Sequence, residues 1–153
     1  MKQLEKQRRC EQLQKLSKEH QDSILMAEKI AKIVNQGSAA ALLEGIDLLK
    51  KYNETELETH LQHEERMIFA PLIQNHKEHL DLCIQLGKEH GFMRTIVEEI
   101  SPETAKRDLA DFARVLKSHS IMEETELFPI IESLFSKEQL DEVLNFKPWL
   151  PLH

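Results

Sequence analysis

The sequence contains an approximate internal repeat that places histidine and glutamate at matching positions. The segment Leu-Ser-Lys-Glu-His that ends at His20 resembles Leu-Gly-Lys-Glu-His ending at His90. The segment from Thr59 to Glu65 resembles that from Ser118 to Glu124, and each is followed by phenylalanine and proline. The two matches have different offsets along the chain, as expected for a duplicated helical hairpin whose loop has changed length. The repeat therefore predicts two related helical hairpins.

The repeated histidines lie on the apolar stripes of their predicted helices. Residues three, four and seven apart share one face of a helix. Around His20 these positions hold Leu16 and Ile24, and the other repeated histidines have similar apolar neighbours. Glu64 and Glu123 each follow a histidine by four residues, so they share its inward face. The histidines expected to face the core are His20, His60, His90 and His119.

Burying four imidazoles and two carboxylates in one small core costs free energy that other interactions must offset. A buried unpaired charge costs several kcal/mol, and each unsatisfied polar group about 1–3 kcal/mol. Two cations would neutralise the carboxylates, and imidazole with carboxylate suits iron, zinc or manganese. A hydrogen-bonded core network without metal is the alternative. The predicted metal ligands are His20, His60, Glu64, His90, His119 and Glu123, with Glu65 and Glu124 interpreted either as their outer hydrogen-bond partners or as a solvated face.

The composition predicts an all-α fold. The chain has four Gly, five Pro and 5% aromatic residues, while good helix formers dominate. Cap signals divide it into helices over about 4–34, 38–70, 76/80–100 and from 101 to about 128 or a turn beyond, with a short fifth helix over about 136–145. Gly37 and Ser38 separate the first two, Pro71 is expected to end the second, and Ser101 and Ser136 are expected N-caps. Short connections favour an up-down four-helix bundle.

The whole chain, 1–153, is expected to be a single domain with its core over 10–135 and a short helix and apolar tail over 136–153. A formal net charge of -7 argues against nucleic-acid binding. Two cysteines form no disulfide framework, which suits a reducing compartment. Neither a signal peptide nor a membrane-spanning run is visible, so a cytoplasmic protein is predicted.

The remaining histidines are interpreted outside the main site. His63 lies off the apolar stripe and is expected to be exposed. His76 and His79 are expected in a loop or on the surface, although they share a face with Cys83 if the third helix includes them. At three turns from His90, or ~16 Å, His79 cannot join the same centre. A second small site at these three residues remains an open alternative.

The segments KEHQDSIL, HLQHEERMIFAPLI, KEHGFMRTIVEEI and HSIMEETELFPII resemble the hemerythrin-like, or His–His–Glu cation-binding, domains from about Leu13 to Ile131. The resemblance implies a four-helix bundle with a non-haem di-iron centre of two Fe ions, oxo- or hydroxo-bridged. It implies that both glutamates bridge and that the six residues named above are the ligands. No Glu-x-x-His pair is present, which argues against ferritin-like di-iron proteins.

One position departs from the oxygen carriers of that family, which have a fifth histidine where this chain has Leu86. The resemblance therefore implies reaction with, or sensing of, a small oxidant (O2, peroxide or nitric oxide) or of iron and redox state, rather than reversible oxygen carriage. The alternatives are a metal-stabilised regulatory or interaction module, and a bundle that binds zinc or manganese without redox chemistry.

Overall fold

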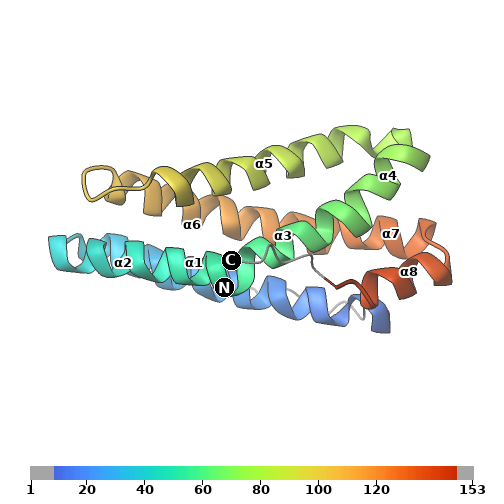
Figure 1. Ribbon diagram of the computed structural model, residues 1–153, viewed down its shortest axis with the longest axis horizontal. Coiled ribbons are helices and arrows are strands. Elements are labelled where there is room, and N and C mark those ends of the chain that lie inside the picture. Colours follow the sequence, from blue (N-terminus) through green and yellow to red (C-terminus); the bar gives the residue numbers. More distant parts are fainter. Residues whose placement is uncertain (1–8, 148–153) are drawn as a thin grey trace.

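The computed structural model of the chain describes residues 9–147, which form helices joined by short connections (Figure 1). No strand occurs in this range, so the predicted all-α class is confirmed. The helices are α1 (Gln14–Gln36), α2 (Ala39–Tyr52), α3 (Glu58–Glu64), α4 (Ala70–Asn75), α5 (Leu80–Glu99), α6 (Ala105–Met122), α7 (Phe128–Leu134) and α8 (Lys137–Leu144). Short 3-10 turns are η1 (Glu11–Leu13) and η4 (Lys77–His79), and π-helical turns are η2 (Asn53–Leu57), η3 (Glu65–Phe69) and η5 (Glu123–Leu127).

The π-helical turns join consecutive helices without a loop. Their first residues, Asn53, Glu65 and Glu123, keep right-handed helical dihedral angles. Thus α2, α3 and α4 form one continuous helical stretch, and α6 and α7 form another. These stretches run alongside α1 and α5, with α1 against both α2 and α6 (Figure 1). A π turn changes which side chains face inward and often occurs at functional sites. The residues beside η3 and η5 are therefore candidates for a functional site.

Several predicted helix ends are confirmed. Gly37 ends α1 in the left-handed conformation, with φ of 69°, and its N–H donates to the carbonyl of Ile33. The Ser38 hydroxyl accepts from the N–H of Ala41, which satisfies a free donor in the first turn of α2. Ser136 and Gln139 form the reciprocal capping box that begins the fifth helix, α8.

Other predicted boundaries were wrong. Pro71 does not end the second stretch, because it lies in the first turn of α4, where a missing N–H is tolerated directly after the π turn η3. Ser101 is no N-cap: residues 102–104 form a turn, Thr104 accepts the Ser101 N–H, and α6 begins at Ala105. The predicted start at residue 4 lies outside the described residues, and within them Arg9 and Cys10 precede the first helical turn. The tail over 148–153 also lies outside them.

The buried apolar residues form two clusters with the repeated histidines between them. Along α1, Leu16 belongs to one cluster and Ala27 to the other, with His20 in between. On α5, Leu86 and Met93 divide in the same way around His90. The inward polar groups therefore occupy one level of the bundle, closed by apolar packing on both sides.

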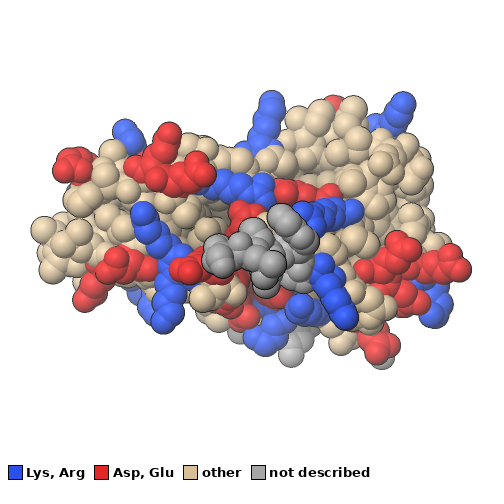
Figure 2. Space-filling view, viewed as in Figure 1, with Lys and Arg blue, Asp and Glu red and all other residues tan. Residues whose placement is uncertain are grey.

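The surface of the bundle carries both signs of charge. Figure 2 shows acidic and basic side chains interspersed along the face seen in Figure 1. In the part of the chain that the structure describes, no helix has both the length and the hydrophobicity needed to cross a membrane.

Candidate metal centre

The six residues predicted as ligands converge on one buried point. Their side chains come from α1, α3, α5, α6 and the first position of η5, and each is at most 7% exposed. They divide into two groups, each with its candidate ligand atoms within 4.8 Å of one another. The groups are His20, His60, Glu64 and Glu123, and Glu64, His90, His119 and Glu123.

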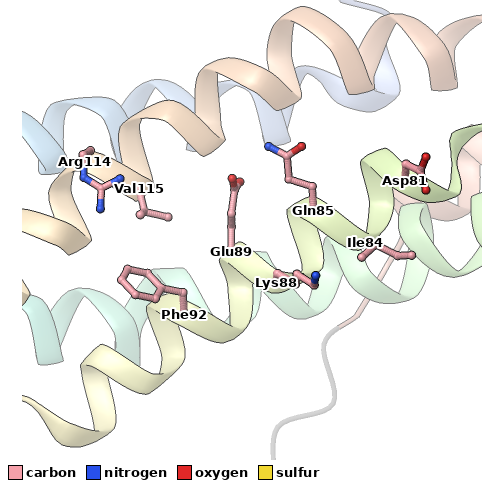
Figure 3. A pocket seen from close by; sticks show the side chains of 8 residues that line it. All are labelled: Asp81, Ile84, Gln85, Lys88, Glu89, Phe92, Arg114 and Val115. Atoms are coloured by element: carbon pink, nitrogen blue, oxygen red, sulfur yellow. The ribbon is translucent and has the colours of Figure 1, made fainter.

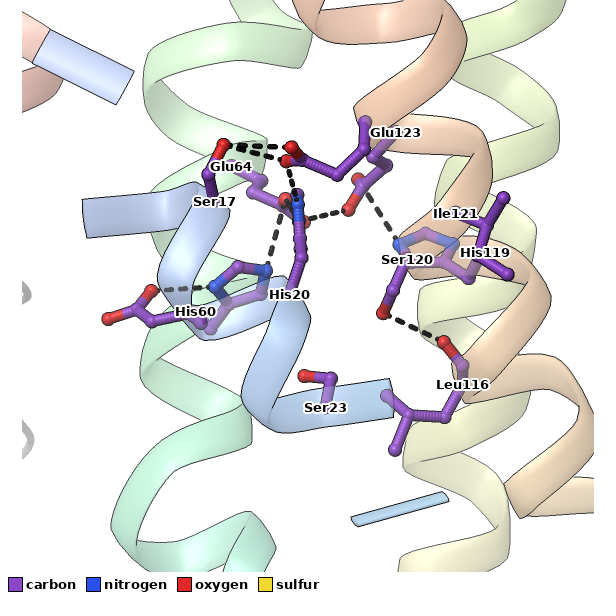
Figure 4. A network of polar contacts seen from close by, with 12 residues as sticks. Ser17, His20, Ser23, His60, Glu64, Leu116, His119, Ser120, Ile121 and Glu123 are labelled. Atoms are coloured by element: carbon purple, nitrogen blue, oxygen red, sulfur yellow. Dashed lines mark hydrogen bonds and ion pairs between the residues drawn. The ribbon is translucent and has the colours of Figure 1, made fainter. Parts of the chain in front are cut away.

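Both glutamates belong to both groups because their two oxygens face different histidines. The Oε2 atom of Glu64 lies 3.0 Å from His20 Nε2 and 3.1 Å from His60 Nε2, while its Oε1 atom lies 3.3 Å from His90 Nε2. The Oε1 atom of Glu123 lies 2.8 Å from His20 Nε2, and its Oε2 atom lies 3.2 Å from His119 Nε2. This is the arrangement of two carboxylates that can bridge a pair of cations (Figure 4).

Each imidazole is fixed by a carboxylate on its far side. A carboxylate oxygen only accepts, so each Nδ1 carries the proton and, in a neutral ring, Nε2 presents its lone pair to the centre. The Nδ1-to-carboxylate pairs are His20 with Glu124 at 2.6 Å, and His60 with Glu19, His90 with Glu65 and His119 with Glu89, each at 2.7 Å. Such outer carboxylates orient metal-binding histidines and increase their basicity.

The centre therefore contains more acceptors than donors. The Nε2 atoms of His90 and His119 are only 3.0 Å apart, so two neutral rings would point lone pairs at each other. With neutral rings, the buried Oε1 atom of Glu64 and both buried oxygens of Glu123 have no hydrogen-bond donor among residues 9–147. A buried acceptor without a partner costs about 1–3 kcal/mol. Cations between these atoms would remove that cost, so the residues present fit a pair of metal ions.

The matching family model gives an independent comparison. The hemerythrin HHE cation-binding domain matches residues 8–131. The chain belongs to the hemerythrin HHE cation-binding family. Comparison with curated proteins and with solved structures gave no significant match. The match covers most of the chain and all six residues of the cluster.

Protons take the place of cations when this hemerythrin-family domain holds no metal. Desolvation by itself lowers the pKa of a buried histidine, but the charge of Glu64 and the hydrogen bond to Glu19 outweigh it and raise the pKa of His60 to about 9. Desolvation likewise lowers the pKa of His119, but the charge of Glu123 and the hydrogen bonds to Glu123 and Glu89 outweigh it and raise that pKa to about 10. Metal binding must therefore displace protons from the rings.

The outer carboxylates follow the duplication of the hemerythrin-family sequence. Two outer carboxylates directly precede a candidate ligand: Glu19 accepts from His60, and Glu89 accepts from His119. The other two directly follow a candidate ligand: Glu65 accepts from His90, and Glu124 accepts from His20. Sequence reasoning left the roles of Glu65 and Glu124 open and missed those of Glu19 and Glu89. The available signal was the Lys-Glu-His triplet that occurs in both repeats.

The other histidines of the domain lie away from this centre. The prediction that His63 is exposed was wrong: it is 5% exposed, its Nε2–H donates to the Val143 carbonyl at 2.6 Å, and its ring stacks on Phe146 at 4.7 Å. His76 and His79 are partly exposed beside Glu78. Among residues 9–147 they form no metal-ligand group with Cys83, which lies in an apolar cluster.

A hollow of about 560 Å³ lies between α5 and α6. In Figure 3 the Glu89 side chain extends from α5 into the space before α6. The same carboxylate accepts from His119 Nδ1, so Glu89 connects the lining of the hollow to a candidate ligand. The residues lining it are Asp81, Ile84, Gln85, Lys88, Glu89, Phe92, Arg114 and Val115.

Proposed function

We propose that this domain is an up-down four-helix bundle that binds two iron ions and reacts with, or senses, a small oxidant such as O2, peroxide or nitric oxide. The ligands in this proposal are His20, His60, Glu64, His90, His119 and Glu123. Each metal receives two histidines, and both glutamates bridge. The observation that carries the proposal is that the two oxygens of each buried glutamate face different pairs of histidines.

The donor set favours metals that accept both nitrogen and oxygen ligands. Imidazole and carboxylate suit iron, and they also suit zinc and manganese. Four neutral rings leave the two negative charges of Glu64 and Glu123 to balance cations at the centre, in line with a binuclear site. Bound iron would supply redox chemistry and open coordination positions for a small molecule.

Apolar side chains next to the centre determine whether water and further ligands can reach it. Phe69 lies against His90 with ring centroids 5.2 Å apart, and Phe128 lies against His20 at 5.0 Å. Leu86, one turn before His90, is fully buried and supplies no ligand. These apolar side chains exclude bulk water from the centre. Because position 86 is a leucine, the side of the centre next to His90 has no fifth histidine. We therefore favour reaction or sensing over reversible oxygen carriage.

Truncation of His60 or His119 tests the ligand set. His60→Ala and His119→Ala each remove one ring nitrogen from one half of the centre, so neither variant is expected to bind two irons per chain. The wild-type protein, purified in air, should contain two irons and show charge-transfer absorption. Metal analysis and an absorption spectrum measure both properties. His76→Ala, which changes a partly exposed histidine, should retain the wild-type iron content.

Two irons in either truncated variant would show that the ligand set is wrong. Reactivity is tested separately, by adding peroxide or ferrous iron and oxygen to the purified protein. Consumption of peroxide or oxidation of iron would support the proposed chemistry. A protein stabilised by metal but inert in both assays would instead support a regulatory or interaction module, and a colourless zinc protein would exclude the iron chemistry.

A further inference from the structure

Arg94 makes an unusually complete set of hydrogen bonds next to the centre. It lies on α5 one turn beyond His90 and contacts two carboxylates from the neighbouring stretch. Its Nε and Nη2 atoms donate to Glu58 at 2.8 and 2.9 Å, while Nη1 and Nη2 donate to Glu65 at 2.7 and 3.1 Å. The planar guanidinium thus holds both carboxylates in two-point contacts, which a lysine ammonium cannot reproduce.

The Glu65 carboxylate connects this clamp to the centre. Its Oε2 atom accepts from Arg94 and also from His90 Nδ1, at 2.7 Å in each case. The Glu65 side chain is 34% exposed, compared with 13% for Glu124. An exposed carboxylate has rotational freedom that a buried one lacks. The four bonds of Arg94 therefore restrict the position of Glu65 and, through it, the orientation of the His90 ring.

The related half of the duplicated centre holds its outer carboxylate differently. The position that corresponds to Arg94, four residues after His20, is Ile24, and the position that corresponds to Glu58 is Lys117. There Glu124 accepts instead from the Ser17 hydroxyl at 2.8 Å and from Arg9 Nε at 3.5 Å, and Arg9 also donates to Glu132 at 2.8 Å. The carboxylate on His20 is thus buried and held by a hydroxyl and by Arg9, which precedes the first helical turn. The carboxylate on His90 is held instead by two-point contacts from Arg94, which lies on the same helix as His90.

We infer that Arg94 is a positioning residue that sets the affinity of the metal held by His90 and His119, through Glu65 and independently of the other half. This inference rests on the proposed binding of two metal ions. Loss of an outer-shell partner of a metal ligand typically weakens metal binding by about 10–100-fold. Because Arg94 contacts only one of the two halves, its loss should make two otherwise similar metal positions unequal.

The test uses the full-length protein loaded with two Co²⁺ ions, whose release to a chelator is followed by absorbance. In Arg94→Gln one of the two ions is expected to leave about 10–100 times faster than in the wild type, while the other keeps its wild-type rate. Arg94→Lys should restore the slower release only in part. Glu58→Gln, which weakens the clamp but leaves Arg94 and Glu65 in place, should give an intermediate rate.

Arg107→Gln is the matched control, since Arg107 is 72% exposed and pairs with the adjacent Asp108; release should remain as in the wild type. The His90 Nδ1–H proton resonance should shift in Arg94→Gln, which a change in stability alone would not cause. Unchanged release of both ions, or equal acceleration of both, would overturn the role of Arg94. Failure of the wild type to bind two ions would instead overturn the proposed function, and this inference with it.

Discussion

Glu64→Ala is expected to lose both metal ions, whereas a single histidine truncation directly affects only one half of the centre. The two oxygens of Glu64 face His20 and His60 on one side and His90 on the other. Removing them takes an anionic ligand from each proposed metal at once, and the remaining carboxylate, Glu123, cannot balance two cations. Metal content should fall from two ions per chain to a substoichiometric level.

Glu64→Gln makes the same test with less change of volume. The amide keeps one oxygen but replaces the other with a nitrogen that is not a metal ligand, so bridging is lost while the side chain still fills its space. Metal content and affinity, measured by elemental analysis and chelator competition, should fall for both ions. Glu126→Ala changes an exposed glutamate three residues from Glu123 and should be neutral. Retention of one tightly bound ion in Glu64→Ala would contradict the bridging role.

The metal-free protein is expected to lose stability as the pH rises from about 6.5 towards 10. The pKa of His60 is raised to about 9 and that of His119 to about 10 by their carboxylate partners, against an ordinary value of 6.5. A raised pKa means that the folded state binds the proton more tightly than the unfolded state. The resulting stabilisation is complete below the unfolded pKa and disappears as the pH passes through the folded values.

At acidic pH the stability of the metal-free protein changes with pH in the opposite direction. Desolvation would raise the pKa of Glu64, but the charge on His60 and the hydrogen bonds from the rings lower it well below 4.5. The stability that this carboxylate contributes is therefore present above about 4.5 and is lost as the pH falls further. Thermal unfolding in the presence of a chelator should show greatest stability between these two limits.

Metal should reverse the alkaline trend, because cations and protons compete for the same ring nitrogens. The difference in melting temperature between loaded and metal-free protein should grow as the pH rises from 6.5 to 9. At a free metal concentration 1,000 times Kd the stabilisation is about 4 kcal/mol, which corresponds to about 10 °C for a chain of this length. A difference that does not change with pH would show that metal binding displaces no protons, and the protonated centre described above would be wrong.

The sequence by itself determined those features that depend on neighbours along the chain. Gly37, Ser38 and Ser136 end or begin helices through contacts within a few residues, and each was predicted from local signals. Helical spacing likewise placed His20 and Glu64 on inward faces, because the apolar stripe of each helix must turn towards the core. The duplication then indicated that the inward groups of four helices would meet at one level, where the structure brings them together.

Only the tertiary structure decided the features that depend on neighbours across helices. Glu19 and Glu89 bind histidines 41 and 30 residues away. The repeated Lys-Glu-His triplet singles these carboxylates out, but it does not show which groups they meet on the neighbouring helices. His63 is off the stripe of its own helix, yet it is buried because Val143 and Phe146, at and beyond the end of the C-terminal helix, cover it. The physical reason is the same in both cases. Helical periodicity determines the direction in which a side chain points, but its contacts depend on how the helices pack against one another.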